Sequence, residues 1–308
     1  MKKKFALVVI VVCSSIATMA CDICGSGAGG GYMGLLPGFR KKFISMRYLQ
    51  NSLQSHLAPG GSSTYLTSKE AFRIAELWGA VNIGEKFRVA AFVPFNFLKR
   101  SNGTGDYSHS GIGDVSVLGY CQLMNRSSTT KADKLFMQSL WIGAGIKLPS
   151  GKYNPDEKNV LESSQNTFQL GTGSVDFSLN AMYDIRLQDA GINVNAGYKI
   201  NSENKYEYKY GNKFTTNVLA YYKISAGKSI SISPNAGVLY ETSAKDQRSK
   251  DIKVWETGGH SLAGTLGLEF SFGAIGVGMN YQKPIEQDLG EGKIKAKDRG
   301  MLYVSFSF

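Results

Sequence analysis

The chain ends in the nine residues GMLYVSFSF, Gly300–Phe308, whose apolar and polar side chains alternate up to the last position. One set of alternate positions carries large apolar side chains, namely Leu302, Val304, Phe306 and Phe308. The positions between them carry Tyr303, Ser305 and Ser307. A period of two residues is typical of a β-strand with one apolar and one polar face. The last segment of the chain is therefore predicted to be a strand that stops on an aromatic residue.

The opposite end has the layout of an export signal. Lys2, Lys3 and Lys4 precede an apolar run of 9 residues, Phe5–Cys13, and small residues follow as far as Ala20. This order is typical of a secretory signal peptide, and the run is too short to span about 30 Å of hydrocarbon. We predict that residues 1–20 are a signal peptide and that the chain is exported.

A C-terminal strand that ends on Phe308 resembles the terminal signal of bacterial outer-membrane β-barrels, which the barrel-assembly machinery reads. Combined with an export signal, this resemblance implies the outer membrane of a Gram-negative bacterium as the location. It also implies two kinds of partner, the assembly machinery and the lipid and lipopolysaccharide of that membrane.

Alternation recurs along the whole chain after the leader. The clearest case is SVDFSLNAMYDI, where Phe177, Leu179 and Tyr183 share one face and Asp176, Asn180 and Asp184 share the other. Twelve segments of this kind are predicted as strands: Lys42–Leu53, Glu70–Ile83, Phe87–Leu98, Ile112–Leu123, Leu135–Leu148, Gly173–Leu187, Gly191–Ile200, Phe214–Ser225, Ser229–Tyr240, Leu262–Phe272, Ala274–Lys283 and Met301–Phe308. Pro94 and Pro234 fall inside two of them, where each requires a bulge or a position near a strand end.

Short connections such as Gly84–Lys86 and Gln188–Ala190 alternate with long ones such as 149–172 and 241–261. Short periplasmic turns and longer extracellular loops are typical of outer-membrane barrels. The predicted fold class is therefore all-β, with a single transmembrane antiparallel β-barrel of about 12 strands over residues 41–308. Residues 21–40 are predicted to be a glycine-rich periplasmic segment that acts as a tether or partial plug.

Charge and hydropathy fit this class. Lys and Arg exceed Asp and Glu by 11, and removal of the leader lysines leaves an excess of 8. The basic residues lie mostly between strands, as in NKYEYKYGNK (204–213), so they are expected to face lipopolysaccharide or water and not nucleic acid. The mean hydropathy of −0.16 is compatible with a barrel, whose membrane signal lies in alternation.

The predicted inner face of the barrel carries both signs of charge in equal number. The basic residues are Arg47, Arg88, Lys147, Lys199 and Lys223, and the acidic residues are Glu76, Asp114, Asp176, Asp184 and Glu269. An equal number of the two signs favours paired charges across a narrow lumen over an ion path of one sign. These ten residues are the candidates for lumen or ligand contacts.

Three motifs occur in order along the chain: GIGDVSVLGYCQL (Gly111–Leu123), GIKLPSG (Gly145–Gly151) and LGTGSVD (Leu170–Asp176). Their order and spacing resemble the outer-membrane barrel family named for the MetA pathway of phenol degradation. The resemblance implies a β-barrel and the uptake of small apolar solutes.

The stretch CDICGSGAGGGYMG, Cys21–Gly34, places two cysteines directly after the predicted cleavage point. Zinc would require two further ligands, and His56, His109 and His260 fall in or beside loops on the other side of the membrane. We therefore predict no metal and no cofactor. Lipidation of Cys21 and a disulfide between Cys21 and Cys24 remain as alternatives.

The predicted function is passive uptake of small hydrophobic or amphipathic compounds through the barrel. A structural or assembly-partner barrel without transport is the alternative. An enzyme is not expected, because none of the three histidines pairs with a serine on an adjacent predicted strand.

Deletion of Phe308 tests the terminal signal. The deletion removes little buried area, so the stability of the assembled barrel should change little, whereas outer-membrane levels should fall with degradation in the periplasm. Quantitative immunoblotting of membrane fractions measures the effect. Assembly of the truncated chain at the normal level and rate would contradict the prediction.

Overall fold

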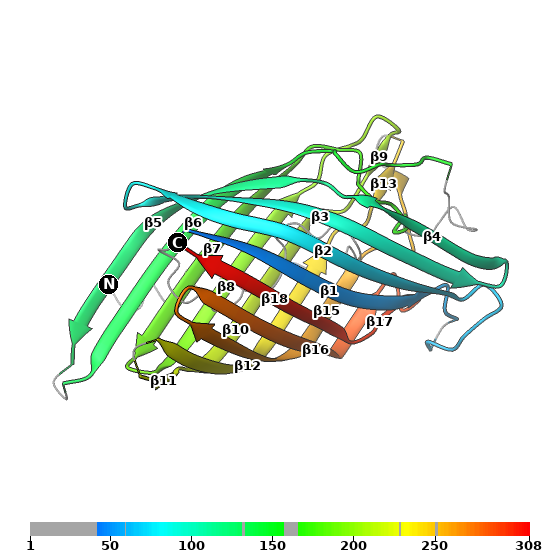
Figure 1. Ribbon diagram of the computed structural model, residues 1–308. Helices are drawn as coiled ribbons and strands as arrows, with labels where there is room; N and C mark the ends of the chain where they lie inside the picture. Colours follow the sequence, from blue (N-terminus) through cyan, green and yellow to red (C-terminus); the bar gives the residue numbers. More distant parts are fainter. Residues whose placement is uncertain (1–41, 59, 131–132, 157–165, 228, 250–251) are drawn as a thin grey trace, which may run out of the picture.

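The computed structural model describes residues 42–58, 60–130, 133–156, 166–227, 229–249 and 252–308 (Figure 1). In these ranges the regular secondary structure is β-strand. No helix in the described ranges is long and apolar enough to cross a membrane. The signal peptide and the segment 21–40 lie outside the described residues.

Twelve antiparallel strands form a closed barrel. They are β1 (Phe43–Ser55), β2 (Ser68–Ile83), β3 (Phe87–Asn102), β5 (Ser116–Thr129), β6 (Leu135–Lys147), β7 (Asp176–Leu187), β8 (Ala190–Ile200), β10 (Lys213–Tyr222), β12 (Ile230–Ser243), β15 (Gly259–Phe272), β16 (Ile275–Leu289) and β18 (Arg299–Ser307). Each pairs with its neighbours in this order, and pairing of β1 with β18 closes the ring. The predicted barrel and its strand number are confirmed.

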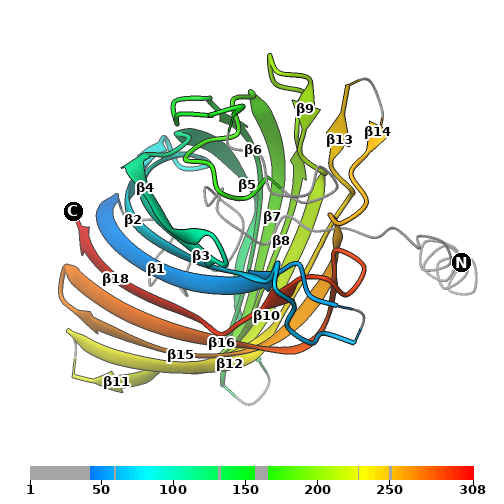
Figure 2. The same ribbon diagram turned by 90° about the vertical axis from the view of Figure 1, so that its right-hand side faces the viewer.

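Six short strands accompany the barrel. Three of them extend it: β4 (Gly105–Ile112) pairs with β3, β11 (Ile224–Ala226) with β12, and β17 (Lys295–Ala296) with β1. The others, β9 (Tyr208–Lys209), β13 (Gln247–Arg248) and β14 (Ile252–Lys253), form a separate sheet of three strands. Figure 2 shows that this small sheet stands beyond one rim of the barrel.

The two ends of the barrel differ. At one end, here termed the turn end, tight connections such as Gly84–Lys86 join the strands, and the start of β1 pairs with the end of β18. At the other, the loop end, the connections are long and include residues 56–67, 148–175, 201–212, 244–258 and 290–298. This asymmetry matches the predicted alternation of short turns and long loops.

The register of the closing pair agrees with the sequence pattern. β1 and β18 pair from Phe43↔Ser307 to Gln50↔Gly300, so the terminal strand meets the first strand as predicted. Along β1 the inward residues Phe43, Ser45 and Arg47 are buried, and the outward residues between them are exposed. Closure satisfies the backbone groups of both strands, each of which would cost several kcal/mol if left unpaired in lipid.

The sheet departs from a regular lattice next to both prolines. The segment predicted as one strand, Ile112–Leu123, is broken at residues 113–115 into β4 and β5, so that prediction was wrong in detail. Pro94 lies where β3 changes partner from β5 to β4, and its carbonyl accepts a hydrogen bond from Gly113 at 2.9 Å. Pro234 likewise lies where β12 changes partner from β10 to β11. Neither proline needs a bulge in its own strand, because the neighbouring strand is interrupted instead.

Close approach of β10 and β12 depends on Gly237. A Cβ atom at this position would lie 1.9 Å from the carbonyl oxygen of Val218 and 2.9 Å from the Cα of Leu219. We expect Gly237→Ala to destabilise the barrel by about 1–3 kcal/mol, the usual cost of overpacking. The measurement is the temperature at which the folded, fast-migrating gel band is lost.

Gly300→Ala is the matched control, because a Cβ there meets nothing within 4 Å. Equal transition temperatures for the two variants would contradict the proposed close approach.

Candidate functional site

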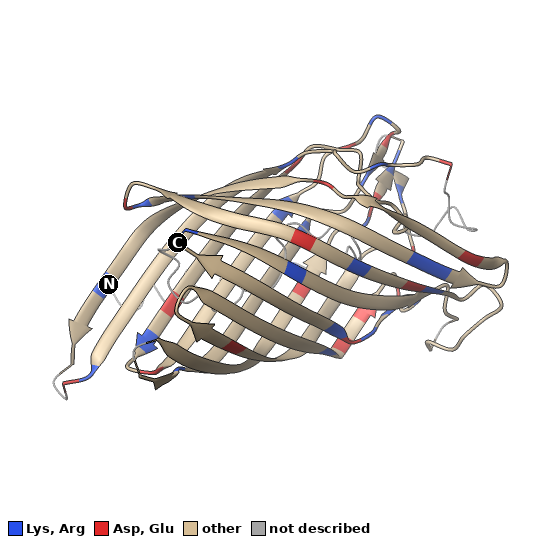
Figure 3. Cartoon of the chain, in the orientation of Figure 1, with Lys and Arg blue, Asp and Glu red and all other residues tan. Residues whose placement is uncertain are grey.

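Charged residues of both signs lie along the barrel strands, as Figure 3 shows. The densest group lies toward the loop end, where β6 ends at Lys147 and β7 begins at Asp176. These two residues are direct partners across the ladder, and both side chains point inward. Asp114, in the break between β4 and β5, completes the group. Each of the three sequence motifs thus contributes one charged residue.

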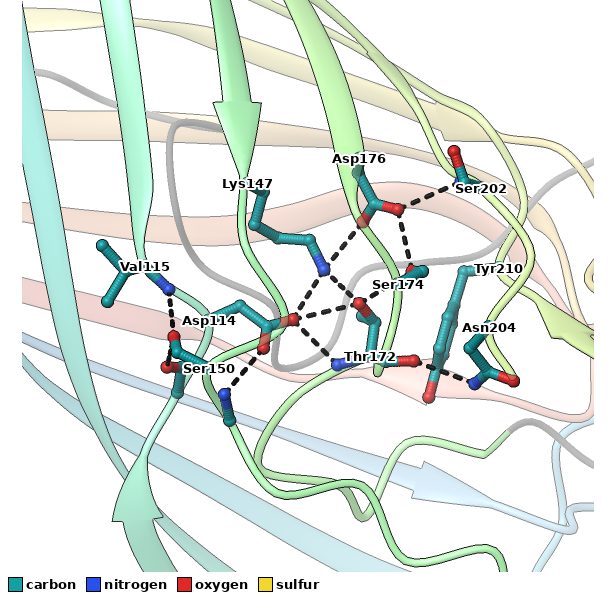
Figure 4. Close-up of polar contacts among 12 residues, drawn as sticks. Asp114, Val115, Lys147, Ser150, Thr172, Ser174, Asp176, Ser202, Asn204 and Tyr210 are labelled. Atoms are coloured by element: carbon teal, nitrogen blue, oxygen red, sulfur yellow. Dashed lines mark hydrogen bonds and ion pairs between the residues drawn. The ribbon is translucent and has the colours of Figure 1, made fainter. Parts of the chain in front are cut away.

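Lys147 is buried between the two carboxylates (Figure 4). Its Nζ lies 2.6 Å from Oδ2 of Asp114 and 2.8 Å from Oδ2 of Asp176, and it also donates to the hydroxyl of Thr172. Lys199 approaches the same Asp176 oxygen at 3.6 Å. We name Asp114, Lys147, Thr172, Ser174, Asp176 and Lys199 the clamp.

Further donors satisfy the carboxylates of the clamp. Asp114 accepts hydrogen bonds from the backbone N–H of Gly151 at 3.0 Å and of Thr172 at 2.8 Å. Asp176 accepts from the Ser174 hydroxyl at 2.8 Å and from the N–H of Ser202 at 3.0 Å. A buried ion pair offsets its desolvation cost only when the remaining lone pairs are satisfied in this way. The clamp therefore ties three loop segments to three strands, β6, β7 and β8.

Two glycines allow the legs of the 148–175 loop to touch. A Cβ on Gly171 would lie 2.7 Å from the Cα of Gly151 and 2.3 Å from Oδ1 of Asp114, so no larger residue fits. The hydroxyl of Ser150 donates to the carbonyl of Gly113 at 2.9 Å and accepts from the N–H of Val115 at 2.8 Å. Ser150 thereby satisfies backbone groups that the strand break leaves without a ladder partner.

From the clamp, the returning leg of this loop crosses the lumen. The amide of Asn96, on β3, donates to the carbonyl of Leu170 at 2.9 Å. Phe168 is buried among inward side chains of several strands, and the guanidinium of Arg100 lies 4.4 Å from its ring centre. We name this the loop-end cluster; its buried members are Leu53, Phe72, Leu98, Phe168, Leu289, Ile294 and Ala296. The loop is therefore a barrier across the loop end of the barrel.

Two further apolar clusters line the lumen. At mid-height, Leu219 of β10 packs against Leu49, Met301 and Tyr303. Toward the turn end, Trp78 stacks on Phe92 with ring centres 5.3 Å apart and meets Phe43 edge to face. We name these the middle cluster and the turn-end cluster; the latter comprises Phe43, Trp78, Ala80, Ala90, Phe92, Leu118, Tyr120, Trp141 and Met182.

The structure brings six of the ten predicted lumen residues together in two groups of ion pairs. Asp114, Lys147, Asp176 and Lys199 meet in the clamp, and Arg47 and Glu76 form a buried ion pair lower in the barrel. The other four have different neighbours. Arg88 donates to Asn82 at 3.1 Å and lies over the Phe43 ring, and Glu269 interacts with Tyr303. Asp184 accepts from Tyr221 at 3.1 Å and from Asn193 at 3.2 Å. Lys223 lies at the turn end between β10 and β11.

A second group of charges was not predicted. Glu241 lies 2.9 Å from Lys213 and 2.6 Å from Arg299, which comes from a strand three places away in the ring. Glu70 pairs with Arg100 at 2.9 Å and accepts from Thr167 in the loop. The sequence pattern could have identified two of these residues. Glu70 lies an even number of residues from Glu76, and Arg100 an even number from Arg88, so each pair is on the same inward face of its strand.

The remaining predicted positions are Cys21, Cys24 and Phe308. Cys21 and Cys24 lie outside the described residues. Phe308 follows β18; its N–H donates to the carbonyl of Lys42 at 2.9 Å, and its side chain is 68% exposed. In the described ranges no three His, Cys, Asp or Glu residues are grouped so that they could hold a metal ion.

Two titratable groups at the loop end have altered pKa values. Burial lowers the pKa of the His56 imidazole, because desolvation disfavours the charged ring, while Glu256 and Glu70 act in the opposite direction. Burial and the neighbouring Asp246 carboxylate raise the pKa of Tyr208 well above its ordinary value. Tyr208 therefore stays protonated and donates to Asp246, which also accepts from the N–H of Gly211 at 2.8 Å.

Removal of a clamp carboxylate should unfold the loop end. Asp176, whose exposure is 1%, lies within ion-pair distance of two lysines, so Asp176→Ala leaves Asp114 as the one clamp carboxylate beside two largely buried ammonium groups. Loss of one partner of a buried pair costs about 3–5 kcal/mol. We expect a corresponding fall in the thermal transition of the folded gel band in detergent.

Asp106→Ala is the control. Its carboxylate lies 3.8 Å from Lys99, but both side chains are more than 60% exposed, at 64% and 62%. Loss of an exposed pair costs about 0–1 kcal/mol. An unchanged transition for Asp176→Ala would place that carboxylate in water and disprove the clamp.

Solved structures similar to this chain are outer-membrane proteins. An outer membrane channel from Pseudomonas putida F1 superposes with a TM-score of 0.60 at 16% sequence identity, covering 87% of this chain and 96% of that one. The β domain of the Bordetella autotransporter BrkA gives 0.50 at 9% identity, covering 87% and 100%. Likeness at this identity supports the fold alone. Among curated proteins, no sequence matches this chain significantly.

The family described as "Putative MetA-pathway of phenol degradation" matches residues 51–281. The match contains the three motifs and all the residues of the clamp. It extends over well more than half of the 308 residues. The resemblance inferred from the three motifs is thus confirmed, and the chain belongs to this family of outer-membrane-type β-barrels.

Proposed function

We propose that the protein lies in the outer membrane of a Gram-negative bacterium and passes small hydrophobic or amphipathic solutes through its barrel. The observation that carries this proposal is the series of apolar clusters along the lumen. The loop-end, middle and turn-end clusters follow one another along the barrel axis. An apolar solute could move from one cluster to the next without entering a wholly polar section.

The charges of the lumen support the same class of solute. Lys147 lies between two carboxylates, Arg47 pairs with Glu76, and Glu241 meets two basic residues. Rings of one sign of charge are the usual device for selecting ions. In these three groups charges of opposite sign are paired, so they hold the barrel in shape and provide polar contacts for an amphipathic solute without favouring one sign of ion.

The similarity to solved structures is in keeping with this proposal. The Pseudomonas putida protein is described as an outer membrane channel, and it has the same fold. An outer-membrane location implies two kinds of partner. Lipid and lipopolysaccharide would surround the barrel, and the assembly machinery would bind β18 and Phe308. The exposed Phe308 side chain is accessible to such a partner.

A barrel without transport is the second candidate. The observation that favours it is that Phe168 of the loop packs across the loop end of the barrel and that Leu219 of β10 packs against side chains of β1 and β18. The two candidates differ in the expected effect of weakening the packing of the loop. Solute uptake should rise if the barrel is a channel and should stay unchanged if the barrel is structural.

Uptake by whole cells distinguishes them. Cells with the protein should take up a labelled phenolic compound and a medium-chain fatty acid several-fold faster than cells without it, and arabinose at the same rate. Phe168→Ala should raise uptake of the apolar solutes further, because Phe168 is the centre of the loop-end cluster. Tyr65→Ala is the control, since Tyr65 is a loop residue that is 87% exposed. Equal uptake with and without the protein, and with Phe168→Ala, would favour the structural barrel.

A further inference from the structure

Leu219 makes a contact that the position of its strand does not explain. Its side chain is 0% exposed and packs with Met301 and Tyr303 of β18 and with Leu49 of β1. Around the ring, β10 is four places from β18 and five places from β1. Side chains that far apart in the wall can meet only across the lumen. The middle cluster therefore bridges the lumen and constricts it.

A circular barrel of this size would not close in this way. Eight strands already give an interior that side chains just fill, and the diameter grows with strand number. The wall of twelve strands must therefore bend inward at β10.

The outer surface agrees with an inward bend. An apolar concavity of about 830 Å³ lies on the outside of the wall from β2 to β8 and reaches β10 at Phe214. Among the outward residues that line it are Gly119, Ala144, Ala181 and Ala196, and larger ones such as Phe87, Leu179 and Tyr198 also contribute. Small outward side chains let this part of the wall lie closer to the barrel axis.

Within the described part of the chain, polar side-chain atoms beside the constriction lack hydrogen-bond partners in this closed arrangement. Among the described residues, neither amide atom of Asn217 has a hydrogen-bond partner, although its exposure is 1%. Asn195, its direct partner on β8, and Asn51 on β1 each have an unpartnered buried amide oxygen. Asn217 and Asn51 lie two residues from Leu219 and Leu49 on the same inward face. A buried polar group without a partner is costly, and water entering an opened lumen would remove that cost.

We infer that Leu219 is the gate of the channel and that Asn217 favours its open state. The inference rests on the proposed function, since a gate controls flux only in a channel. In the closed state Leu219 seals the lumen against β1 and β18. In the open state β10 moves outward, the external concavity becomes shallower, and water or the polar group of an amphipathic solute hydrogen-bonds to Asn217.

The test is conductance in planar bilayers and permeation of a small neutral phenolic solute into liposomes. Leu219→Ala should raise both several-fold over wild type, because it removes the side chain that crosses the lumen. Val218→Ala is the control: this neighbour on β10 faces outward and is 37% exposed, so its variant should behave as wild type. Heat-modifiable gel migration verifies that each variant is a folded barrel.

The outcomes separate the gate from the proposed function. A wild-type protein that conducts and a Leu219→Ala variant that conducts equally would disprove the gate and leave the channel. Folded wild-type and Leu219→Ala proteins that both fail to conduct would overturn the gate and the channel together. Asn217→Leu should lower the fraction of time spent open, and an unchanged or higher open fraction would contradict its role.

A reversible cross-link provides the second test. With the native cysteines replaced by serine, Leu219→Cys and Met301→Cys together should form a disulfide across the lumen. Oxidation should then abolish permeation and a reductant should restore it. Failure of the disulfide to form in the folded barrel, or equal permeation in both redox states, would overturn the inference.

Discussion

The buried ammonium of Lys147 is the interaction on which the inside of this barrel depends. It lies between Asp114 and Asp176 and joins the break in the sheet, the end of β6 and the start of β7. Both legs of the 148–175 loop bind the carboxylate of Asp114 through backbone N–H groups. Without the ammonium, two carboxylates would be buried side by side, which is strongly unfavourable. The position of the loop across the lumen therefore follows from one cation and its two partners.

The lumen combines two kinds of packing. Most of its ion pairs connect neighbouring strands and fix the shape of the wall, and the pair of Glu241 with Arg299 spans three places in the ring. The apolar contact of Leu219 joins strands that are further apart. Arg47 shows both, because it pairs with Glu76 and also lies 5.6 Å from the ring centre of Trp78. Such a lumen is rigid where charges are paired and adaptable where side chains such as Leu219 and Met301 merely touch. Movement is then expected at the apolar contacts.

Much of the fold could be predicted from the sequence, because a barrel strand alternates with a period of two along its whole length. The same period placed Lys147 and Asp176 on the inner face. It could not show that Asp184 of β7 would bind Tyr221 of β10, since β8 lies between these strands and the contact depends on the register of both ladders. The sequence pattern also did not predict the break at residues 113–115 or the position of Phe168 inside the barrel. Residues outside strands have no regular alternation from which their positions could be inferred. The contact of Leu219 across the lumen depends on the curvature of the whole wall, which no local segment encodes.

The seam between β1 and β18 has a kinetic consequence. It joins residues near the two ends of the chain, as in the bond of 2.8 Å from the Ser45 hydroxyl to the carbonyl of Val304, 259 positions away. The entropy of closing so large a loop opposes early pairing, and contacts of high sequence separation form slowly. Every other neighbouring pair in the ring consists of strands consecutive among the twelve, which can pair as they emerge. An open sheet with two unpaired edges is therefore expected to exist during biogenesis, and the time it spends in this form sets how long it must be shielded from aggregation.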